Sequence, residues 1–265
     1  NYNKMELLGT LTIIGYTLST LSIRYVLIDE EYSFYKKTSF DIVFFLSLLL
    51  FSVYSYSIIN NVYQKFNFIT SLQITFLIVN YLFFLFMFSK PIKHLGLVLL
   101  PLTAIAIFIS MIYHDNASLG LIDSDLRAHI SVSIASYGFL GLGAIQAILL
   151  RYQEKKLKDV SDSLFLTILP SIEKMEKVMF DLIIFGFILL TLSLLSGSPF
   201  VSMGEHPGLA EKILFSIIAW ITYSYLIYRR FSKGVRGRKA TNLTLSGMFF
   251  LLVAYLGTKL FFEIY

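Results

Sequence analysis

Long uncharged stretches rich in hydrophobic residues alternate with short charged stretches along the whole chain. A helix needs about 20 mostly apolar residues to cross the roughly 30 Å hydrocarbon layer of a membrane. The pattern therefore predicts eight membrane-spanning helices, and the flanking Lys and Arg side chains of the short seventh one can reach toward the lipid headgroups. The stretches without Asp, Glu, Lys or Arg cover residues 7–23, 42–64, 66–89, 94–114, 128–150, 182–204, 213–228 and 240–258.

These stretches are too uniformly apolar for a transmembrane β-barrel, whose strands alternate polar and apolar residues over about ten positions. We therefore expect an all-α membrane protein, built as a single integral domain over residues 1–265. The longest connection, 151–177, begins with the basic sequence RYQEKKLK and contains a ten-residue uncharged segment. Since that segment is too short to cross, we expect residues of about 160–175 to form an amphipathic segment on the inner face of the membrane.

The distribution of Lys and Arg between the connections predicts how the helices are oriented. An even number of spans places both termini on the same side of the membrane. The connections on the opposite side contain 16 Lys and Arg residues, whereas the terminal side contains five. Because cytoplasmic connections carry the excess of Lys and Arg, this distribution places both termini outside.

The composition agrees with a membrane protein and removes several functional classes. Of the 265 residues, 56% are hydrophobic and 15% are charged, whereas about a quarter are charged in soluble domains. The net charge of +5 suits loops that face an anionic leaflet, so we expect the lipid bilayer as a partner and no nucleic acid. The chain has no cysteine, GxxxxGK[ST] phosphate loop or HExxH zinc motif, which argues against thiol chemistry, P-loop nucleotide binding and this type of zinc hydrolase.

Histidine is the main candidate for chemistry, because few other ionisable groups fall within the expected spans. The predicted orientation places His94 inside and His114, His129 and His206 at or near the outside. His129 opens the fifth span, where its imidazole, a common axial ligand of haem iron, can point into an outward-facing cavity. The alternative is a histidine at the edge of a helix, hydrogen-bonded to water or to a neighbouring carbonyl.

Small residues recur along the fifth span after His129. Such residues let helix backbones approach closely within a membrane, where no hydrophobic force drives helices together. We interpret the stretch as a packing face at the centre of the bundle, which would hold His129 rigidly; a binding groove is the alternative. These residues are Ser131, Ser133, Ala135, Ser136, Gly138, Gly141, Gly143 and Ala144.

Four stretches of the C-terminal half resemble, in order and spacing, the CcsA/CcmC-type cytochrome c assembly family, especially its short YpjD-like and HemX-like branch. The resemblance implies a multi-pass protein of a bacterial inner membrane that handles haem on the outer side, with haem-delivery or cytochrome c assembly partners. It also implies that His129, which falls on an outward histidine of the family, is a haem ligand. The stretches are HISVSIASYGFLGLGAIQAILLRYQEKKLK (129–158), LPSIEKMEKVMFDLIIFGFILLTLSLLSG (169–197), KILFSIIAWITYSYLI (212–227) and GVRGRKATNLTLSGMFFLLVAYLG (234–257).

Other positions depart from the family pattern. The tryptophan-rich external motif of the family is expected just before Lys212, where this chain reads SPFVSMGEHPGLAE. Trp220, the only tryptophan, matches a later family position, and Tyr228 stands where the family has a histidine within the membrane. His129 is thus the one retained ligand of the family set, and His206, in the loop where the motif would lie, is the candidate substitute.

Three functional hypotheses follow. The first is a haem-handling or cytochrome c maturation protein that holds haem through His129 and makes no bond by itself, hence a binding factor rather than an enzyme. The second is a haem-free membrane scaffold or regulatory partner, because the tryptophans that would stack on a porphyrin are missing. The third is a small-molecule transporter.

Overall fold

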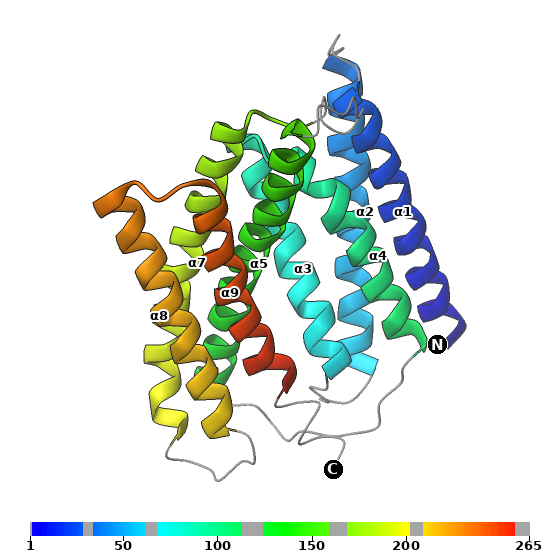
Figure 1. The fold of residues 1–265 in the computed structure, drawn as a ribbon. Coiled ribbons are helices and arrows are strands. Elements are labelled where there is room, and N and C mark those ends of the chain that lie inside the picture. The colour runs from blue at the N-terminus through cyan, green and yellow to red at the C-terminus, as the bar shows by residue number, and fades with distance from the viewer. Residues whose placement is uncertain are drawn as a thin grey trace. The chain divides into compact units, whose positions relative to one another are not determined.

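The structure is a computed structural model that describes residues 2–28, 34–61, 68–112, 124–158, 169–201 and 209–257. Within these ranges the regular secondary structure is helical and no strand occurs, which confirms the all-α class. A short 3₁₀ turn, Lys93–Leu95, precedes α4, and a π-helical turn, Val253–Gly257, follows α9. The α-helices are α1 (Tyr2–Ile28), α2 (Phe34–Asn61), α3 (Phe68–Ser89), α4 (Gly96–Ile112), α5 (Ser124–Lys158), α7 (Ile172–Val201), α8 (Leu209–Lys233) and α9 (Gly237–Leu252) (Figure 1).

Over its described residues, each of the eight apolar stretches lies on one of these α-helices, except that the fourth begins in the 3₁₀ turn and the eighth ends in the π-helical turn. Six described helices are long and apolar enough to cross a membrane: α1, α2, α4, α5, α7 and α8. In α3 the apolar part is the shorter segment Leu72–Phe86, and α9 has 16 residues. The structure thus supports a multi-pass membrane protein, while eight spans and external termini stay predictions.

The helices extend beyond the apolar stretches because the charged residues that flank these stretches continue the helical backbone. The clearest case is α5, whose 35 residues span about 52 Å and exceed the thickness of the hydrocarbon layer. Its last turns contain the sequence RYQEKKLK, made mostly of good helix formers. Of the expected inner-face segment, residues 160–168 lie outside the described residues, and residues 172–175 form the first turn of α7.

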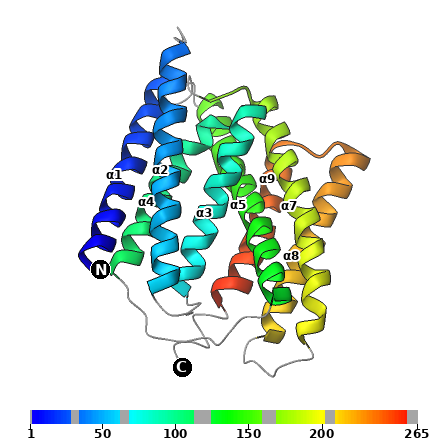
Figure 2. The ribbon, with the colours of Figure 1, turned by 180° about the vertical axis from the view of Figure 1, so that it is seen from behind.

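The chain divides into two compact units. Unit 1 contains α1 to α4, and unit 2 contains α5, α7, α8 and α9. In each unit, helices that follow one another in the chain pack together and the last helix packs back on the first. Figures 1 and 2 show that successive helices within a unit run in opposite directions, so each unit is an antiparallel four-helix bundle. The expectation of a single integral domain stays a prediction.

Unit 1 has an aromatic core that also contains paired polar groups. The ring of Tyr16 packs edge-on against Phe44 and Phe51, with centroid distances of 6.3 and 5.8 Å. Within the same bundle, Asn80 Nδ2 donates to Thr103 Oγ1 at 2.8 Å. Interhelical hydrogen bonds of this kind hold helices together in lipid, where hydrophobic association is weak.

Unit 2 is held together by small residues between α5 and α7. Ser136 Oγ donates to the carbonyl oxygen of Gly186 at 2.9 Å, and Ser133 Oγ lies 2.6 Å from Ser193 Oγ. A Cβ atom on Gly186 would lie 2.6 Å from Cγ of Leu140, so the glycine is required by the close approach of the helices. These contacts confirm the interpretation of the fifth apolar stretch as a packing face.

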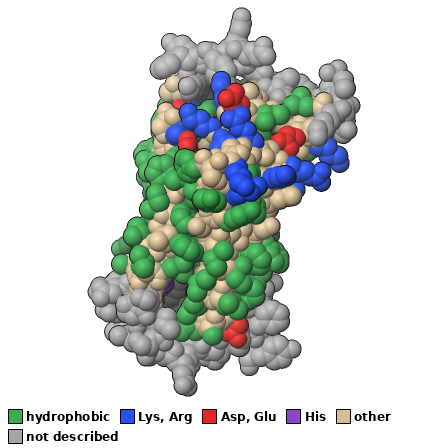
Figure 3. Space-filling model, turned by 60° about the vertical axis from the view of Figure 1, so that its left-hand side comes forward, with side chains coloured by type: hydrophobic (Ala, Val, Ile, Leu, Met, Phe, Trp, Pro, Cys, Tyr) green, Lys and Arg blue, Asp and Glu red, His purple; other side chains and the backbone are tan. Residues whose placement is uncertain are grey.

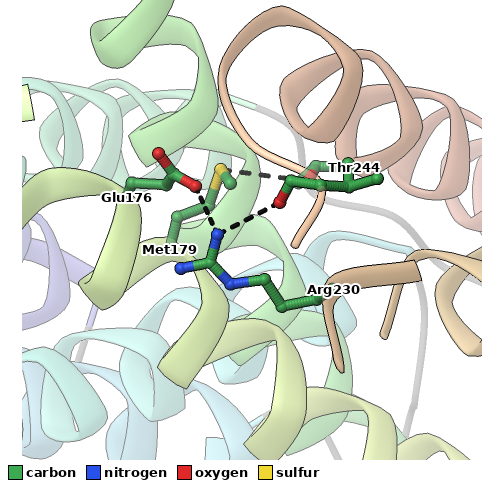
Figure 4. A network of polar contacts seen from close by, with 5 residues as sticks. Glu176, Met179, Arg230 and Thr244 are labelled. Carbon is green, nitrogen blue, oxygen red and sulfur yellow. Dashed lines mark hydrogen bonds and ion pairs between the residues drawn. The ribbon is translucent and has the colours of Figure 1, made fainter. Parts of the chain in front are cut away.

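A polar network fastens the end of unit 2 where α8 turns into α9. Arg230 Nη1 donates to Glu176 Oε1 of α7 at 2.7 Å and to the carbonyl oxygen of Val235 in the turn at 3.1 Å (Figure 4). The guanidinium carbon of Arg230 also lies 4.3 Å from the ring centroid of Phe180. The turn depends on Gly234, whose φ of 60° is readily adopted by glycine alone.

Candidate functional site

His129 lies in the second turn of α5, at the end of unit 2 where α5 begins. Its Nδ1 atom is 3.0 Å from Oγ of Ser196, near the C-terminal end of α7. Ser196 Oγ in turn donates to the carbonyl oxygen of Ser193 at 3.1 Å. Because a hydroxyl has a single proton, the oxygen of Ser196 then accepts a hydrogen bond from Nδ1–H. In this tautomer Nε2 carries the lone pair that a metal could bind, and the ring also hydrogen-bonds to the backbone of Ser193.

The imidazole of His129 lies directly against the backbone of α7. A Cβ atom on Gly197 would lie 2.8 Å from Cε1 of His129, closer than real Cβ contacts allow. The absence of a side chain at position 197 thus creates the space in which the ring lies. One turn further along α5, Ser133 Oγ donates to the carbonyl oxygen of His129 at 2.8 Å. The ring itself is contacted by Ser196 and Gly197 of α7.

This arrangement is suited to axial ligation of a haem iron. Histidines that bind metals commonly donate the other ring N–H to a carbonyl, carboxylate or similar acceptor, which fixes the tautomer and the ring orientation. Ser196 supplies that acceptor for His129. The imidazole is also partly exposed, so it is accessible from outside the helix pair. The donor chemistry of His129 therefore fits a residue that could hold a haem iron.

The opposite end of unit 2 carries the basic cluster expected from the sequence. His129 and Arg151 are separated by 22 residues of the continuous helix α5, which corresponds to about 33 Å. Arg151 Nη2 hydrogen-bonds to Asn242 Oδ1 in the first turns of α9, the helix that begins beside Arg236 and Arg238. His129 and the basic cluster thus lie at opposite ends of the same bundle.

Figure 3 shows the distribution of charge on the side where Figure 1 places α7 and α8. Lys and Arg side chains gather at one end of this face, and hydrophobic side chains cover its middle. This is the distribution of a surface that passes from a headgroup region into hydrocarbon.

Among the other histidines, His94 is the one that the structure describes. His94 lies in unit 1, 2% exposed, beside the ion pair of Lys93 and Asp41. His114 and His206, the candidate substitute ligand, lie outside the described residues. Among the described residues no group of three or more His, Asp or Glu side chains could hold a metal ion. Axial ligation of haem requires no such group.

Trp220 is part of the packing between α8 and α7. Its Nε1 donates to Thr191 Oγ1 at 2.9 Å, and its ring stacks on Phe187 with a centroid distance of 5.6 Å. Tyr228, in contrast, is 64% exposed on α8. The one tryptophan of the chain is therefore engaged within the bundle.

Ser196 and Gly197 were missed by sequence reasoning, which assigned no role to the end of the sixth stretch. A signal was present, because Gly186, Ser193, Ser196 and Gly197 follow the helical spacings of three, four and seven residues. They form on α7 the counterpart of the small-residue face recognised on α5. If the two small-residue faces had been paired in the sequence analysis, Ser196 and Gly197 would have been predicted to lie beside His129.

Comparison with known proteins gives consistent matches. The profile of a family described as "Cytochrome C assembly protein" matches residues 38–265. The inner membrane protein YpjD of Escherichia coli K12 is 29% identical over 135 residues, which are 51% of this chain and 51% of YpjD. A cytochrome c biogenesis protein CcsA of Prochlorococcus marinus is 27% identical over 203 residues, 65% of this chain and 64% of CcsA. The chain thus spans about half the length of YpjD and less than two thirds of CcsA.

Proposed function

Because the chain belongs to the cytochrome c assembly protein family, we propose that it acts in cytochrome c biogenesis in a bacterial inner membrane and handles haem through His129. The observation that carries this proposal is the geometry of His129. Its imidazole is oriented by Ser196 and accommodated by Gly197. It also lies at the end of unit 2 opposite Arg236 and Arg238, which the positive-inside rule places in the cytoplasm. In this proposal the site faces the periplasm.

In this function the chain binds and presents haem, and makes no bond by itself. Haem would supply the iron centre and the vinyl groups that are attached to a cytochrome c. His129 would hold the iron through Nε2, while Ser196 keeps the imidazole in the required tautomer. The partners are then a haem-delivery component and the apocytochrome or another assembly protein. If His206 serves as a second ligand, it does so from the residues that connect α7 to α8, which lie outside the described part of the chain.

A haem-free scaffold or regulatory partner is the second candidate function, and the position of Trp220 favours it. Its indole stacks on Phe187 and donates a hydrogen bond to Thr191 of α7. It therefore offers no external surface on which a porphyrin could stack. A protein with this function would keep the bundle and bind no haem.

The optical spectrum of the purified protein tests the proposal. We expect the wild-type chain from haem-replete cells to show the visible absorption bands of ligated haem, and His129→Ala to lose them. Ser196→Ala keeps the ligand but removes the acceptor for Nδ1–H, so it should weaken haem binding by about 10-fold or more. In His129→Gly, added imidazole should restore the bands, because it can occupy the vacated space.

His94→Gln is the control, because the side chain of His94 is 2% exposed and therefore closed to a ligand, so this substitution should not affect the bands. Loss of the bands in His206→Ala as well would identify the second ligand. A wild-type protein that stays colourless after incubation with haem would contradict the proposal and support the scaffold. Unchanged bands in His129→Ala would exclude His129 as the ligand.

A further inference from the structure

A basic pocket lies in unit 2 at the end opposite His129. It is lined by Arg151, Glu154 and Lys155 from the last turns of α5 and by Arg238 from the first turn of α9. Three cationic side chains and one carboxylate give these lining residues a net positive charge. A pocket of this kind at the boundary of the apolar stretches attracts an anionic group.

An apolar groove continues from this pocket along α9. It is lined by Arg151, Asn242, Leu245, Ser246, Phe249 and Phe250, so Arg151 borders both hollows. Residues 238, 242, 245 and 249 follow helical spacing and lie on one face of α9. The distance along the helix from Arg238 to Phe249 is about 16 Å. The groove therefore leads from the charged pocket into the span that is expected to lie in hydrocarbon.

Two features show that the groove is accessible to a ligand from the membrane. Phe249, near its apolar end, is 61% exposed. Asn242, near its charged end, is also exposed and accepts the hydrogen bond from Arg151. The basic side chains and the apolar wall thus belong to one continuous surface of α5 and α9.

We propose that this surface binds an anionic phospholipid, with the phosphate between Arg151, Lys155 and Arg238 and an acyl chain along Leu245 and Phe249. Arg and Lys donate charge-assisted hydrogen bonds to phosphate oxygens, and basic pockets between membrane helices bind anionic headgroups in this way. The adjoining groove favours a lipid over a free phosphate ion, because an acyl chain can lie along Leu245 and Phe249 while the phosphate binds the basic side chains. The site is separate from His129 and does not depend on haem binding.

The experiment measures binding of phosphatidylglycerol to the full chain in a neutral detergent, with phosphatidylcholine of the same acyl chains as the comparison. We expect the wild type to prefer phosphatidylglycerol. The double variant Lys155→Gln/Arg238→Gln should weaken phosphatidylglycerol binding by about tenfold or more, since each cation contributes to the attraction. It leaves Arg151 and its hydrogen bond to Asn242 in place, so the bundle should stay folded.

Lys233→Gln/Lys239→Gln is the matched control. It removes two exposed cations from the same end of unit 2 without changing a residue that lines the pocket. Binding in this control should stay within about twofold of the wild type, because the headgroup contacts are retained. Equal losses in the two double variants would overturn the proposal.

A second variant tests the acyl chain. Ser246→Trp fills the apolar groove and should weaken phosphatidylglycerol binding while leaving any binding of glycerol 3-phosphate unchanged. If glycerol 3-phosphate binds as tightly as phosphatidylglycerol, the pocket is a site for a soluble phosphate and the lipid assignment is wrong. Displacement of the lipid by haem, detected in the visible spectrum, would equally overturn it. So would a wild type that binds both lipids with the same affinity.

Discussion

At the residue scale, an ion pair between Arg230 of α8 and Glu176 of α7 joins two helices of unit 2. The side chain of Glu176 is 9% exposed and that of Arg230 is 24% exposed, so both charged side chains are largely removed from solvent. The guanidinium also donates to the Val235 carbonyl and lies over the ring of Phe180. Removing one partner of a buried pair costs more than the pair contributes, because the other charge stays desolvated.

We therefore predict that Glu176→Gln lowers the free energy of unfolding by about 2 kcal/mol, as measured by reversible unfolding in mixed micelles. The value lies below that for a fully buried pair because Arg230 is partly exposed. Glu173→Gln, an exposed acidic residue in the first turn of the same helix, should change stability by less than about 0.5 kcal/mol. Equal effects of the two substitutions would show that the ion pair does not stabilise the bundle.

At the scale of the element, the contact between α5 and α7 positions the candidate site. Small residues bring these helices so close that Ser136 hydrogen-bonds directly to the backbone of α7. The same close approach places Ser196 and Gly197 against His129. A change in the separation of the two helices should therefore affect both stability and the position of the imidazole.

Two glycine substitutions distinguish the effect of close helix packing on stability from the effect of helix propensity. In Gly186→Ala the new Cβ would overlap Leu140, so we predict a loss of about 1–3 kcal/mol in unfolding free energy. In Gly141→Ala the nearest atom is Cε of Met248 at 3.7 Å, an ordinary contact, and the variant should gain about 0.5–1 kcal/mol because alanine favours helix. The same unfolding measurement applies, and a stabilising Gly186→Ala would refute the close-packing argument.

At the scale of the whole molecule, the orientation in the membrane decides which side His129 faces. The orientation can be tested on helix α8, because Lys212 and Lys233 are both exposed and lie about 32 Å apart along the helix. This separation matches the thickness of the hydrocarbon layer. The chain has no cysteine, so a single introduced thiol reports its own position without further changes.

We predict that a membrane-impermeant maleimide labels Lys212→Cys in intact spheroplasts and labels Lys233→Cys only after permeabilisation. The unsubstituted chain, which lacks cysteine, is the control for background labelling. The reverse pattern would place His129 in the cytoplasm and contradict haem handling on the periplasmic side. Labelling of both positions in intact spheroplasts would show that α8 does not cross as expected.

Much of the fold could be predicted from the sequence because hydrocarbon imposes a simple rule on the backbone. A stretch of about 20 residues without charge has to be helical in lipid to satisfy its own N–H and C=O groups. The rule does not determine where a helix ends outside the hydrocarbon. For this reason the continuation of α5 through RYQEKKLK was not anticipated, although its Glu, Lys and Arg residues favour helix.

The sequence alone determined the helical class, the order of the apolar stretches, the family and the choice of His129, since each depends on residue types and local spacing. Only the tertiary structure decided what surrounds His129, because Ser196 and Gly197 approach it across 67 and 68 residues of chain. It likewise brought Arg151 and Arg238 to one pocket. Such contacts depend on how closely two helix surfaces pack, and that separation is set by many side chains together, not by the spacing within one helix.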